Sequence, residues 1–538
     1  MNAIKFSNKY ILRNKKLIIV YVFLCIVLSG IGMLSPMVSA RILDSIVEKS
    51  KLKIVINMCL LLFFIGIINL ILAYIKNLLF IKISSYSTNS LNIDIIKHIH
   101  KSPISYISNV NSAYLNHRIN SDSNEVINFT LSLYSDFIQS LLILISSSII
   151  LFIINYEVFV ISVILVTFNL IMYNSLKKKL YYFNNKLKEK QNKFFSDLND
   201  QLYYMKFIKV NSISEWFIKK LNGSFSSYFN VRINYEKFSC IFDNINGIVI
   251  MIAQLVLFIF GANEVIKGSI SVGIFTIIIT YFNSLKGSIS YFFSLGKSYQ
   301  TNNVSYKRIK ELLELPCENC TGELINRIDK IIINNLNFKY EKNQVFKNFN
   351  FKFYPGFVYG IFGKNGSGKS TFIDILVGLH NNFEGKIFIN DKSIKDINIY
   401  KVRESCFGVC EQEPMLINDT IYNNISLGMP IDETKLNLLI KLLNLSNFID
   451  ECENKLDSVI NPYSTNLSGG EKQKISILRT LLKNDSSVLI FDEPTSALDY
   501  KSKINLLNYL KEIKEDKIII LISHDDEIKE IVDEVILL

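Results

Sequence analysis

The stretch Gly363-Lys364-Asn365-Gly366-Ser367-Gly368-Lys369-Ser370 decides how the second half of this chain folds. Its glycines allow positive φ angles and a close approach of the backbone, so that successive N–H groups point inward at an anion. The lysine at position 369 reaches the outer phosphates of a nucleotide, and the hydroxyl at position 370 is a ligand for Mg²⁺. The stretch therefore predicts a binding site for ATP or GTP.

The residues on either side of this loop support the prediction. Residues 357–362 form an apolar run typical of a buried strand, and residues 370–377 have the pattern of a helix that stops at Gly378. A chance glycine-rich loop is the alternative interpretation. The strand–loop–helix order, which phosphate binding requires, argues against it.

The first half of the chain is dominated by long apolar segments. The whole chain of 538 residues is 49% hydrophobic, and its mean hydropathy is +0.26. Segments of roughly 17–25 apolar residues are long enough to cross a bilayer. We expect six crossings, near Leu17–Val38, Ile54–Ile75, Phe137–Ile154, Val158–Tyr173, Ile245–Ile266 and Ile270–Leu285.

The distribution of positive charge predicts the orientation in the membrane. Lysine and arginine gather before the first span and between the fourth and fifth spans, and cytoplasmic loops carry such an excess. Both termini are therefore expected in the cytoplasm. The net charge of +11 then reflects topology and contact with anionic lipids, not binding of nucleic acid.

The domain boundary is expected after a helix-like segment at Val304–Leu315, because Pro316 interrupts the pattern. Residues 1–315 would form the membrane domain with long cytoplasmic helical extensions, residues 316–324 a linker, and residues 325–538 the nucleotide-binding domain. Two stretches of the extensions, Ile99–Tyr106 and Leu202–Val210, are either docking turns for another domain or solvated surface helices.

The nucleotide-binding domain reads as strands alternating with helices, the pattern of an α/β fold with a largely parallel sheet. Its second landmark is Val488-Leu489-Ile490-Phe491-Asp492-Glu493, a buried strand with two carboxylates at its end. Adjacent carboxylates suit two tasks: Asp492 holds Mg²⁺ and Glu493 orients or deprotonates the attacking water. A third landmark, Leu467–Lys474, has a hydroxyl and glycines at the start of a helix that runs to Leu482.

Together these landmarks resemble the ATP-binding cassette (ABC) transporters. Residues 363–371 look like the Walker A loop, 467–473 like the signature motif and 488–493 like the Walker B strand. Residues 496–499 resemble the D-loop, and residues 420–428 resemble the corresponding segment of exporter-type cassettes. A membrane half with six spans upstream of a single cassette is the arrangement of exporter half-transporters. The resemblance covers essentially the whole chain, and it implies a six-helix transmembrane domain followed by an α/β P-loop nucleoside triphosphatase cassette.

The resemblance also implies a role for each residue that matches a family motif. Catalysis falls to Glu493, His524 as the switch histidine and Gln412 as the Q-loop glutamine. Mg²⁺ would be held by Ser370, Gln412 and Asp492. The residues expected to bind ATP, with an aromatic ring stacked on the adenine at the first of them, are Tyr340, Gly363, Asn365, Gly366, Ser367, Gly368, Lys369, Ser370, Thr371, Ser468, Gly469 and Gly470.

A dimer is also implied by the resemblance, because in this family the signature motif of one subunit completes the phosphate site of the other. The partner is a second copy of the chain or a related subunit. ATP binding would close the two cassettes and switch a membrane cavity from inward- to outward-facing, and hydrolysis would reset it. The competing interpretation is a membrane-anchored ATPase that senses or regulates without moving cargo.

The substrate is less well defined by the sequence. The spans carry almost no charge at depth, which favours an amphiphilic cargo such as a peptide, lipid or drug over a sugar or ion. Polar residues of the spans, which also serve as ordinary helix–helix contacts, are Asn69, Gln139, Asn169 and Gln254. Abundant isoleucine, lysine and asparagine are typical of an AT-rich bacterial genome, and we expect a bacterial cell membrane.

Three features depart from the family pattern. Glu471 stands where the signature motif commonly has glutamine, and residues 461–466 lack the usual glycine and glutamate, which puts the coupling of cassette to membrane domain in question. After His524 we expect no further strand, and therefore a less covered sheet edge.

Overall fold

The computed structural model describes residues 2–107, 112–340, 343–364, 366–461, 467–483, 486–524 and 526–538. The chain divides into two compact units. The first comprises Met1–His100 and Val110–Leu315, and the second comprises Lys101–Asn109 and Pro316–Leu538. Most of the stretch Ile99–Tyr106, for which the sequence allows either a docking turn or a surface helix, thus belongs to the second unit, which begins at Lys101.

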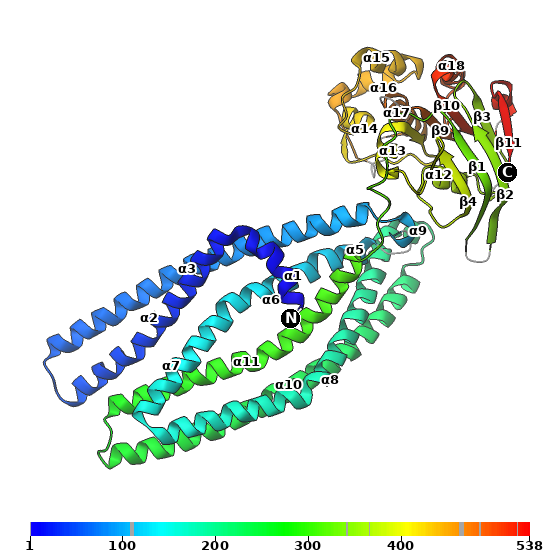
Figure 1. Cartoon of the computed structure of the whole chain (residues 1–538). Coiled ribbons are helices and arrows are strands. Elements are labelled where there is room, and N and C mark those ends of the chain that lie inside the picture. The colour runs from blue at the N-terminus through cyan, green and yellow to red at the C-terminus, as the bar shows by residue number, and fades with distance from the viewer. Residues whose placement is uncertain are drawn as a thin grey trace. The chain divides into compact units, whose positions relative to one another are not determined.

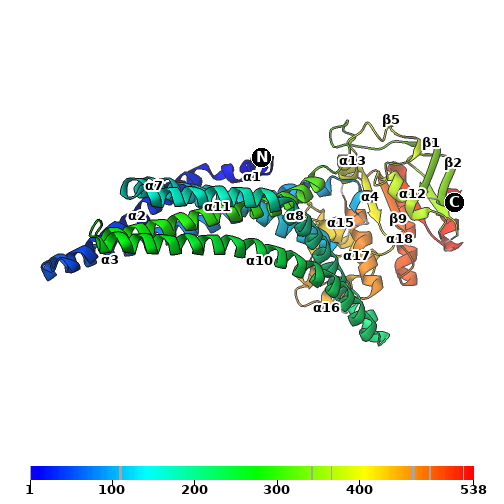
Figure 2. The ribbon, with the colours of Figure 1, turned by 90° about the horizontal axis from the view of Figure 1, so that it is seen from below.

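The first unit is built from helices, several of them far longer than a bilayer is thick (Figure 1). Pairs such as α8 with α10 lie side by side and curve together (Figure 2). The helices are α1 (Asn2–Ile11), α2 (Lys15–Val47), α3 (Leu52–His100), α5 (Ser112–His117), α6 (Ser123–Ser132), α7 (Ile138–Ile154), α8 (Tyr156–Tyr203), α9 (Met205–Val210), α10 (Ser214–Ile266) and α11 (Val272–Leu313). Two π-helical turns, Arg118–Asp122 and Leu133–Phe137, flank α6.

Within the part of the chain that the structure describes, five helical segments are long and apolar enough to cross a membrane. They correspond to five of the six predicted spans, and in the apolar window of Leu52–His100 no residue is buried inside the protein, as lipid-facing helices require. The predicted fourth span lies in α8. It is separated from α7 by Asn155, whose side chain accepts hydrogen bonds from the backbone N–H groups of Glu157 at 2.9 Å and Val158 at 3.2 Å. The break expected at this point is therefore a helix N-cap.

The helix-like segment predicted at Val304–Leu315 is confirmed up to Leu313, as the continuation of the last apolar segment in α11 from Val272 to Leu313. Polar residues of this helix pair with neighbouring elements: buried Asp122 lies 3.2 Å from Nε of Arg308 on α11 and 3.8 Å from Nζ of Lys188 on α8.

The strands described in the second unit form two larger sheets and one small two-stranded sheet. Five strands form a parallel sheet in the order β11-β3-β10-β9-β6, as expected for an α/β fold. Four others form an antiparallel sheet in the order β2-β1-β4-β5, which the sequence did not predict. The strands are β1 (Ile331–Tyr340), β2 (Asn343–Phe353), β3 (Val358–Phe362), β4 (Glu384–Ile389), β5 (Lys392–Ser393), β6 (Phe407–Cys410), β9 (Val488–Asp492), β10 (Ile518–Ile522) and β11 (Glu534–Leu537), with the small pair β7 (Asp419–Thr420) and β8 (Val459–Ile460).

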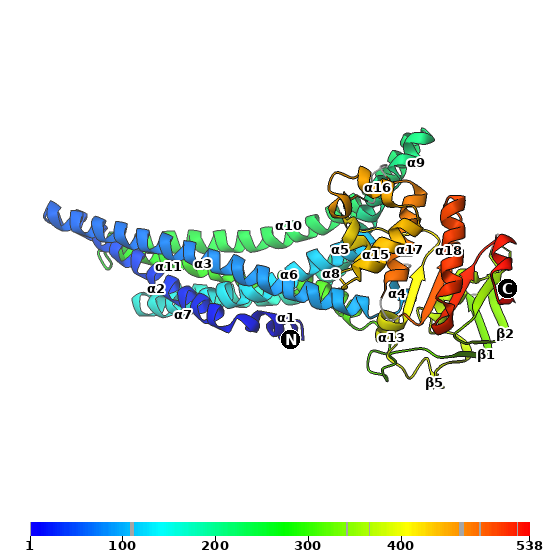
Figure 3. The same cartoon turned by 90° about the horizontal axis from the view of Figure 1, so that it is seen from above.

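Helices surround these sheets. Figure 3 shows α15, α16 and α17 grouped on the side of the unit away from β1 and β2. The helices are α4 (Ile104–Ile107), α12 (Lys369–Leu376), α13 (Ile399–Cys406), α14 (Ile421–Ser426), α15 (Glu433–Leu442), α16 (Ser446–Glu451), α17 (Gly469–Leu482) and α18 (Tyr500–Glu512). The predicted helix end at Leu482 and the predicted buried strands at residues 488–492 and 518–522 are confirmed.

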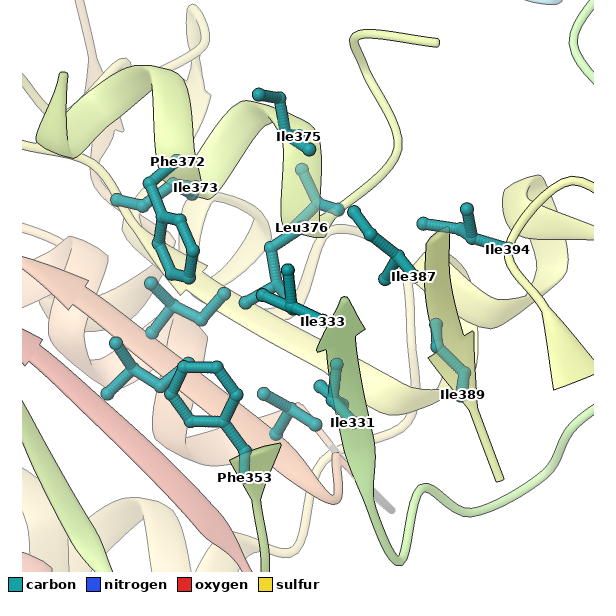
Figure 4. Close-up of a cluster of buried hydrophobic side chains, with 14 of the residues drawn as sticks. Ile331, Ile333, Phe353, Phe372, Ile373, Ile375, Leu376, Ile387, Ile389 and Ile394 are labelled. Atoms are coloured by element: carbon teal, nitrogen blue, oxygen red, sulfur yellow. The ribbon is translucent and has the colours of Figure 1, made fainter. Parts of the chain in front are cut away.

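Helix α12 is fixed by one of the two main hydrophobic clusters of this unit. Phe372 and Leu376 of α12 face Ile331 and Ile333 of β1, with Phe353 of β2 beside them (Figure 4). All five side chains are buried. This packing anchors the helix to the sheet and so holds the start of the helix, where the glycine-rich loop ends, in a fixed place.

The expectation of no strand after His524 is wrong. Strand β11 pairs in parallel with β3, from Glu534 beside Tyr359 to Leu537 beside Phe362. The four-residue strand is too short to show a clear alternation in the sequence, and its pairing with a buried neighbour decides its conformation. The edge of β3 is thus covered.

Candidate nucleotide site

The loop between β3 and α12 has the geometry of a phosphate cradle. Gly366 and Gly368 have φ angles of 81° and 103°, in the region that glycine adopts without strain. A Cβ atom at Gly368 would lie 2.2 Å from Cγ1 of Val345, so this glycine also allows a close approach of β2. Asn365 lies outside the described residues. The remaining predicted loop residues, including Gly363, Ser367, Ser370 and Thr371, lie along this turn and the first turn of α12.

Lys369 lies inside the cradle, with its ammonium group bonded to the loop itself. Its Nζ donates to the carbonyl oxygens of Gly363 at 3.0 Å and Lys364 at 3.3 Å, and it lies 3.0 Å from Nε2 of His524. The side chain is 8% exposed. Among the residues that the structure describes, the ammonium bonds to carbonyl oxygens and an imidazole but to no carboxylate, and a phosphate would supply such an anionic partner.

Ser370 and Asp492 bring two oxygen donors together at the end of the loop. The hydroxyl of Ser370 donates to Oδ2 of Asp492 over 3.3 Å, and Asp492 ends β9. Burial raises the pKa of this carboxyl above its ordinary value, an effect that the Ser370 hydrogen bond and Lys369 oppose. Hydroxyl and carboxylate oxygens are the ligands that Mg²⁺ prefers, and a cation would relieve the cost of the buried carboxylate, so this donor pair fits Mg²⁺.

Glu493 follows β9 in a strained conformation. Its φ of 47° lies in the left-handed region that non-glycine residues rarely adopt. Three contacts hold it there: its N–H donates to the carbonyl of Ile522 at 2.9 Å, its carbonyl accepts from Nε2 of Gln473 at 2.7 Å, and Oε2 accepts from Nε2 of Gln412 at 3.0 Å. Nε2 of His524 lies 3.4 Å from Oε1. The three predicted catalytic side chains therefore lie together, with Gln412 hydrogen-bonded to Glu493 and His524 beside it.

Tyr340 ends β1 with 45% of its surface exposed. Its hydroxyl lies 3.5 Å from Oγ1 of Thr371 and 3.0 Å from Nε2 of His380. The exposed aromatic ring, whose hydroxyl contacts the first turn of α12, offers a surface on which a flat apolar group can stack.

Ser468, Gly469 and Gly470 lie at the start of α17, where they form the N-terminus of the helix. Ser468 is the N-cap and Glu471 closes a capping box: the Ser468 N–H donates to Oε2 of Glu471 at 2.7 Å, and the Glu471 N–H donates to Oγ of Ser468 at 3.2 Å. Glu471, which departs from the family pattern, therefore stabilises this helix start as glutamine would. Within the single chain Ser468 forms its side-chain hydrogen bond with Glu471. The departure from the family pattern at 462–466 lies outside the described residues.

Two residues of the site were missed from the sequence. Gln473, 2% exposed, bridges the Glu493 carbonyl and the N–H of Ala497, which donates to Oε1 at 3.0 Å. His380 contacts Tyr340 from the chain reversal after α12. Gln473 lies in the stretch that resembles the signature motif, but the sequence does not show that it is buried and needs partners on both amide atoms. His380 stands 40 positions from Tyr340, and no local pattern joins them.

Both halves of the chain match known families. Residues 18–289 match the family described as the ABC transporter transmembrane region, and residues 346–496 match the family described as the ABC transporter. The first of these matches alone covers half of the chain.

Relatives include exporters of different length. The multidrug resistance-like ATP-binding protein MdlA of Buchnera aphidicola is 27% identical over 97% of this chain and 92% of its own length. The ATP-dependent lipid A-core flippase of Syntrophus aciditrophicus is 27% identical over 62% of this chain, and the match spans 52% of that protein. ABC transporter B family member 1 of Dictyostelium discoideum is 30% identical over 59% of this chain, and the match spans 35% of that protein.

A solved structure shares the fold. The structure of a bacterial Atm1-family ABC exporter with ATP bound has a TM-score of 0.87 over 97% of this chain and 93% of its own, at 17% sequence identity. The phosphate cradle, the two carboxylates at the end of β9 and the matches to both families lead to one assignment. The chain belongs to the ABC transporters and is of the exporter type, with a multi-pass membrane region and an ATP-hydrolysing cassette fused in one polypeptide.

Proposed function

We propose that this chain, as one of two copies, uses ATP to export an amphiphilic substrate across a bacterial cell membrane. Two relatives support this substrate class by name, one a lipid A-core flippase and one multidrug resistance-like. The apolar character of the membrane helices supports it as well, since they offer a cargo mainly hydrophobic and weakly polar contacts. A peptide, a lipid or a drug has the matching chemistry.

In the proposed cycle the ammonium of Lys369 exchanges its carbonyl partners for the β- and γ-phosphates. Ser370, Asp492 and Gln412 would hold Mg²⁺ beside them, and Tyr340 would stack on the base. Glu493 would orient the attacking water, with His524 stabilising charge on the γ-phosphate. The hydrogen bond that joins Gln412 to Glu493 supports these roles, because it links the side chain proposed to sense Mg²⁺ to the one proposed to act on water.

We propose a homodimer as the working form, in which Ser468 and Gly470 of the second copy complete each nucleotide site. The capping box supports this role. Because Oγ of Ser468 accepts a hydrogen bond from the Glu471 N–H, its own O–H proton is free to donate to a phosphate. The start of α17 adds backbone N–H groups and the positive end of a helix dipole to the same face.

A docking surface for the second copy is proposed at the turn between α8 and α10. Its apolar side chains are exposed, with Tyr203 at 82%, Val210 at 75% and Trp216 at 60% of their surfaces. Within the cassette, a cavity of about 610 Å³ is lined by apolar side chains such as Phe407 and Met429 and also by Ser370, Gln412 and Asp492, so it includes the proposed Mg²⁺ site. We propose that the exposed apolar stretch Leu202–Val210 is a docking turn for another domain and not a solvated surface helix.

The orientation and the domain limits complete the proposal. The lysines of α8 and of the N-terminal segment support cytoplasmic termini, with anionic lipid headgroups beside them. The membrane domain would end at residue 315 and the cassette begin at residue 325, joined by a linker over 316–324.

Uptake into inside-out vesicles tests the function. Vesicles that contain the protein should accumulate a labelled hydrophobic peptide, lipid analogue or cationic dye when ATP is added, whereas vesicles with Glu493→Gln should not. Uptake restricted to small hydrophilic solutes would contradict the substrate class. ATP hydrolysis without movement of any cargo would favour the sensing ATPase instead.

A further inference from the structure

The chain reverses direction after α12 in a way that brings His380 back to β1. Gly378, with a φ of 73°, ends the helix in a Schellman motif: its N–H donates to the carbonyl of Ile375 at 3.0 Å, and the Leu379 N–H donates to that of Asp374 at 2.7 Å. A side chain at position 378 would meet Cγ1 of Ile399 at 2.5 Å. The position of His380 is therefore set by the backbone.

His380 contacts three side chains around the exposed ring of Tyr340. Its Nε2 lies 3.0 Å from the Tyr340 hydroxyl, its ring centroid lies 5.4 Å from that of Phe338, and Nε2 lies 3.8 Å from Oδ2 of Asp374. The histidine side chain is only 15% exposed. The half-exposed Tyr340 is thus hydrogen-bonded to the mostly buried His380.

We propose that His380 is a positioning residue for the nucleotide base: it holds the phenol of Tyr340 in the orientation that stacks on adenine. This inference rests on the proposed role of Tyr340. The edge-on packing of Tyr340 against Phe338, with ring centroids 4.9 Å apart at 89°, limits the ring from one side. The hydrogen bond between the Tyr340 hydroxyl and Nε2 of His380 fixes the hydroxyl end, so the two contacts together set the direction of a ring that is 45% exposed.

The hydrogen bonds that join Tyr340 to His380 and to Thr371 can form at the same time. When Nε2 of His380 carries no proton, it accepts the Tyr340 O–H, and the oxygen of Tyr340 still accepts from the hydroxyl of Thr371. Thr371 lies on the first turn of α12, directly after the phosphate loop. The group therefore joins the surface proposed for the base to the helix that holds the phosphates. Ordering the ring before ATP arrives reduces the entropy cost of binding.

The test is nucleotide binding by the full-length protein in lipid nanodiscs, with Glu493→Gln as the background to prevent turnover. Two variants of the histidine are compared: His380→Leu removes the hydrogen bond and keeps bulk, whereas His380→Gln can restore it. We expect His380→Leu to raise the Kd for Mg-ATP about fivefold to tenfold, the value of one lost hydrogen bond. We expect His380→Gln to stay within about twofold of the parent.

Two further measurements make the result specific. Tyr340→Phe removes the same hydrogen bond while His380 stays intact, so it should match His380→Leu, and the double variant should be no weaker than either. Mg-tripolyphosphate, which has no base, should bind all of these proteins equally. An unchanged Kd for ATP in both His380→Leu and Tyr340→Phe, or an equal loss for ATP and tripolyphosphate, would overturn the inference.

Failure of the proposed base site has a separate signature. Tyr340→Leu removes the ring and should weaken ATP binding more than Tyr340→Phe does. Should Tyr340→Leu bind ATP as tightly as the parent, the base does not stack at this position, and the role of His380 falls with it. If Tyr340→Leu weakens ATP binding but the two hydrogen-bond variants do not, only the role of His380 is overturned.

Discussion

The ammonium group of Lys369 lies 3.0 Å from Nε2 of His524, which joins the phosphate loop to the end of strand β10. An ammonium only donates hydrogen bonds, so Nε2 must accept and carry no proton. The two groups proposed to contact the γ-phosphate thus contact each other. In the proposed cycle, ATP binding would replace this contact with bonds from each group to a phosphate oxygen.

Loss of the Lys369 ammonium should weaken ATP binding. Lys369→Ala removes charge-assisted hydrogen bonds worth about 1.5–3 kcal/mol, so the Kd for Mg-ATP should rise about tenfold to a hundredfold. Calorimetry on the nanodisc-embedded protein measures it. Lys364→Ala is the matched control, because this exposed lysine of the same loop contributes its carbonyl to the Lys369 contacts. Equal losses in the two variants would show that only the net charge of the loop matters.

Asp492 should make the stability of the nucleotide-free protein depend on pH. Burial raises the pKa of Asp492 in the folded protein, above the unfolded value of about 3.9. Its contribution to stability is complete below the unfolded pKa and is lost as the pH rises through the folded pKa. The ionised carboxylate therefore destabilises the protein near neutral pH.

Asp492→Asn tests this relation by thermal unfolding without Mg²⁺. The variant should have a higher Tm than the parent near neutral pH, and the difference should shrink toward about pH 4. It should also lose Mg²⁺-dependent ATP binding. A Tm difference that grows on acidification would contradict the assignment of the buried carboxylate.

Variants of the capping box at α17 distinguish the contribution of Ser468 to helix stability from its proposed contribution to catalysis. Glu471→Gln keeps the capping box and should leave the Tm unchanged, whereas Glu471→Ala should cost about 1 kcal/mol of stability. Ser468→Ala should lose a similar amount and, in addition, the O–H proposed to reach the phosphate of the second copy. Its ATPase activity should therefore fall well below that of Glu471→Ala at equal stability. Equal activities in the two alanine variants would contradict a phosphate contact by Ser468.

Gln473 should act on hydrolysis through the position of Glu493. Gln473→Ala leaves the Glu493 carbonyl and the Ala497 N–H without their side-chain partner, at a cost of about 1–3 kcal/mol in stability. We expect kcat to fall while the KM for ATP stays close to that of the parent. The reason is that the hydrogen bonds of Gln473 go to Glu493 and Ala497, and not to the phosphate loop or to Tyr340. A rise in KM alone, measured by steady-state ATPase assays, would place the residue in nucleotide binding.

Much of this organisation could be predicted from the sequence, because the deciding signals are local. The glycines at 366 and 368 require positive φ, and the apolar runs at 488–491 and 518–522 require burial, so the loop and its flanking strands follow directly. Non-local features could not be predicted. Strand β11 exists because it pairs with β3, and the ion pair between Asp122 and Arg308 joins residues far apart in the sequence.

The candidate site likewise combines local features that the sequence predicts with non-local features that it does not. The residues that match motifs, such as Glu493 and His524, came from the sequence, but the conformation that Glu493 adopts did not. Its φ of 47° is maintained by Gln473 and by the backbone of Ile522, which are brought to it only by the fold.

The most direct test of the account is ATP hydrolysis by the purified chain alone in lipid nanodiscs, beside Glu493→Gln. The account predicts Mg²⁺-dependent hydrolysis by the parent and a loss of about a hundredfold or more in the variant, while ATP binding is retained. Stimulation of the parent by a peptide, lipid or drug would then identify the cargo class. A parent that binds ATP but hydrolyses it no faster than Glu493→Gln, with and without such compounds, would contradict a competent homodimer.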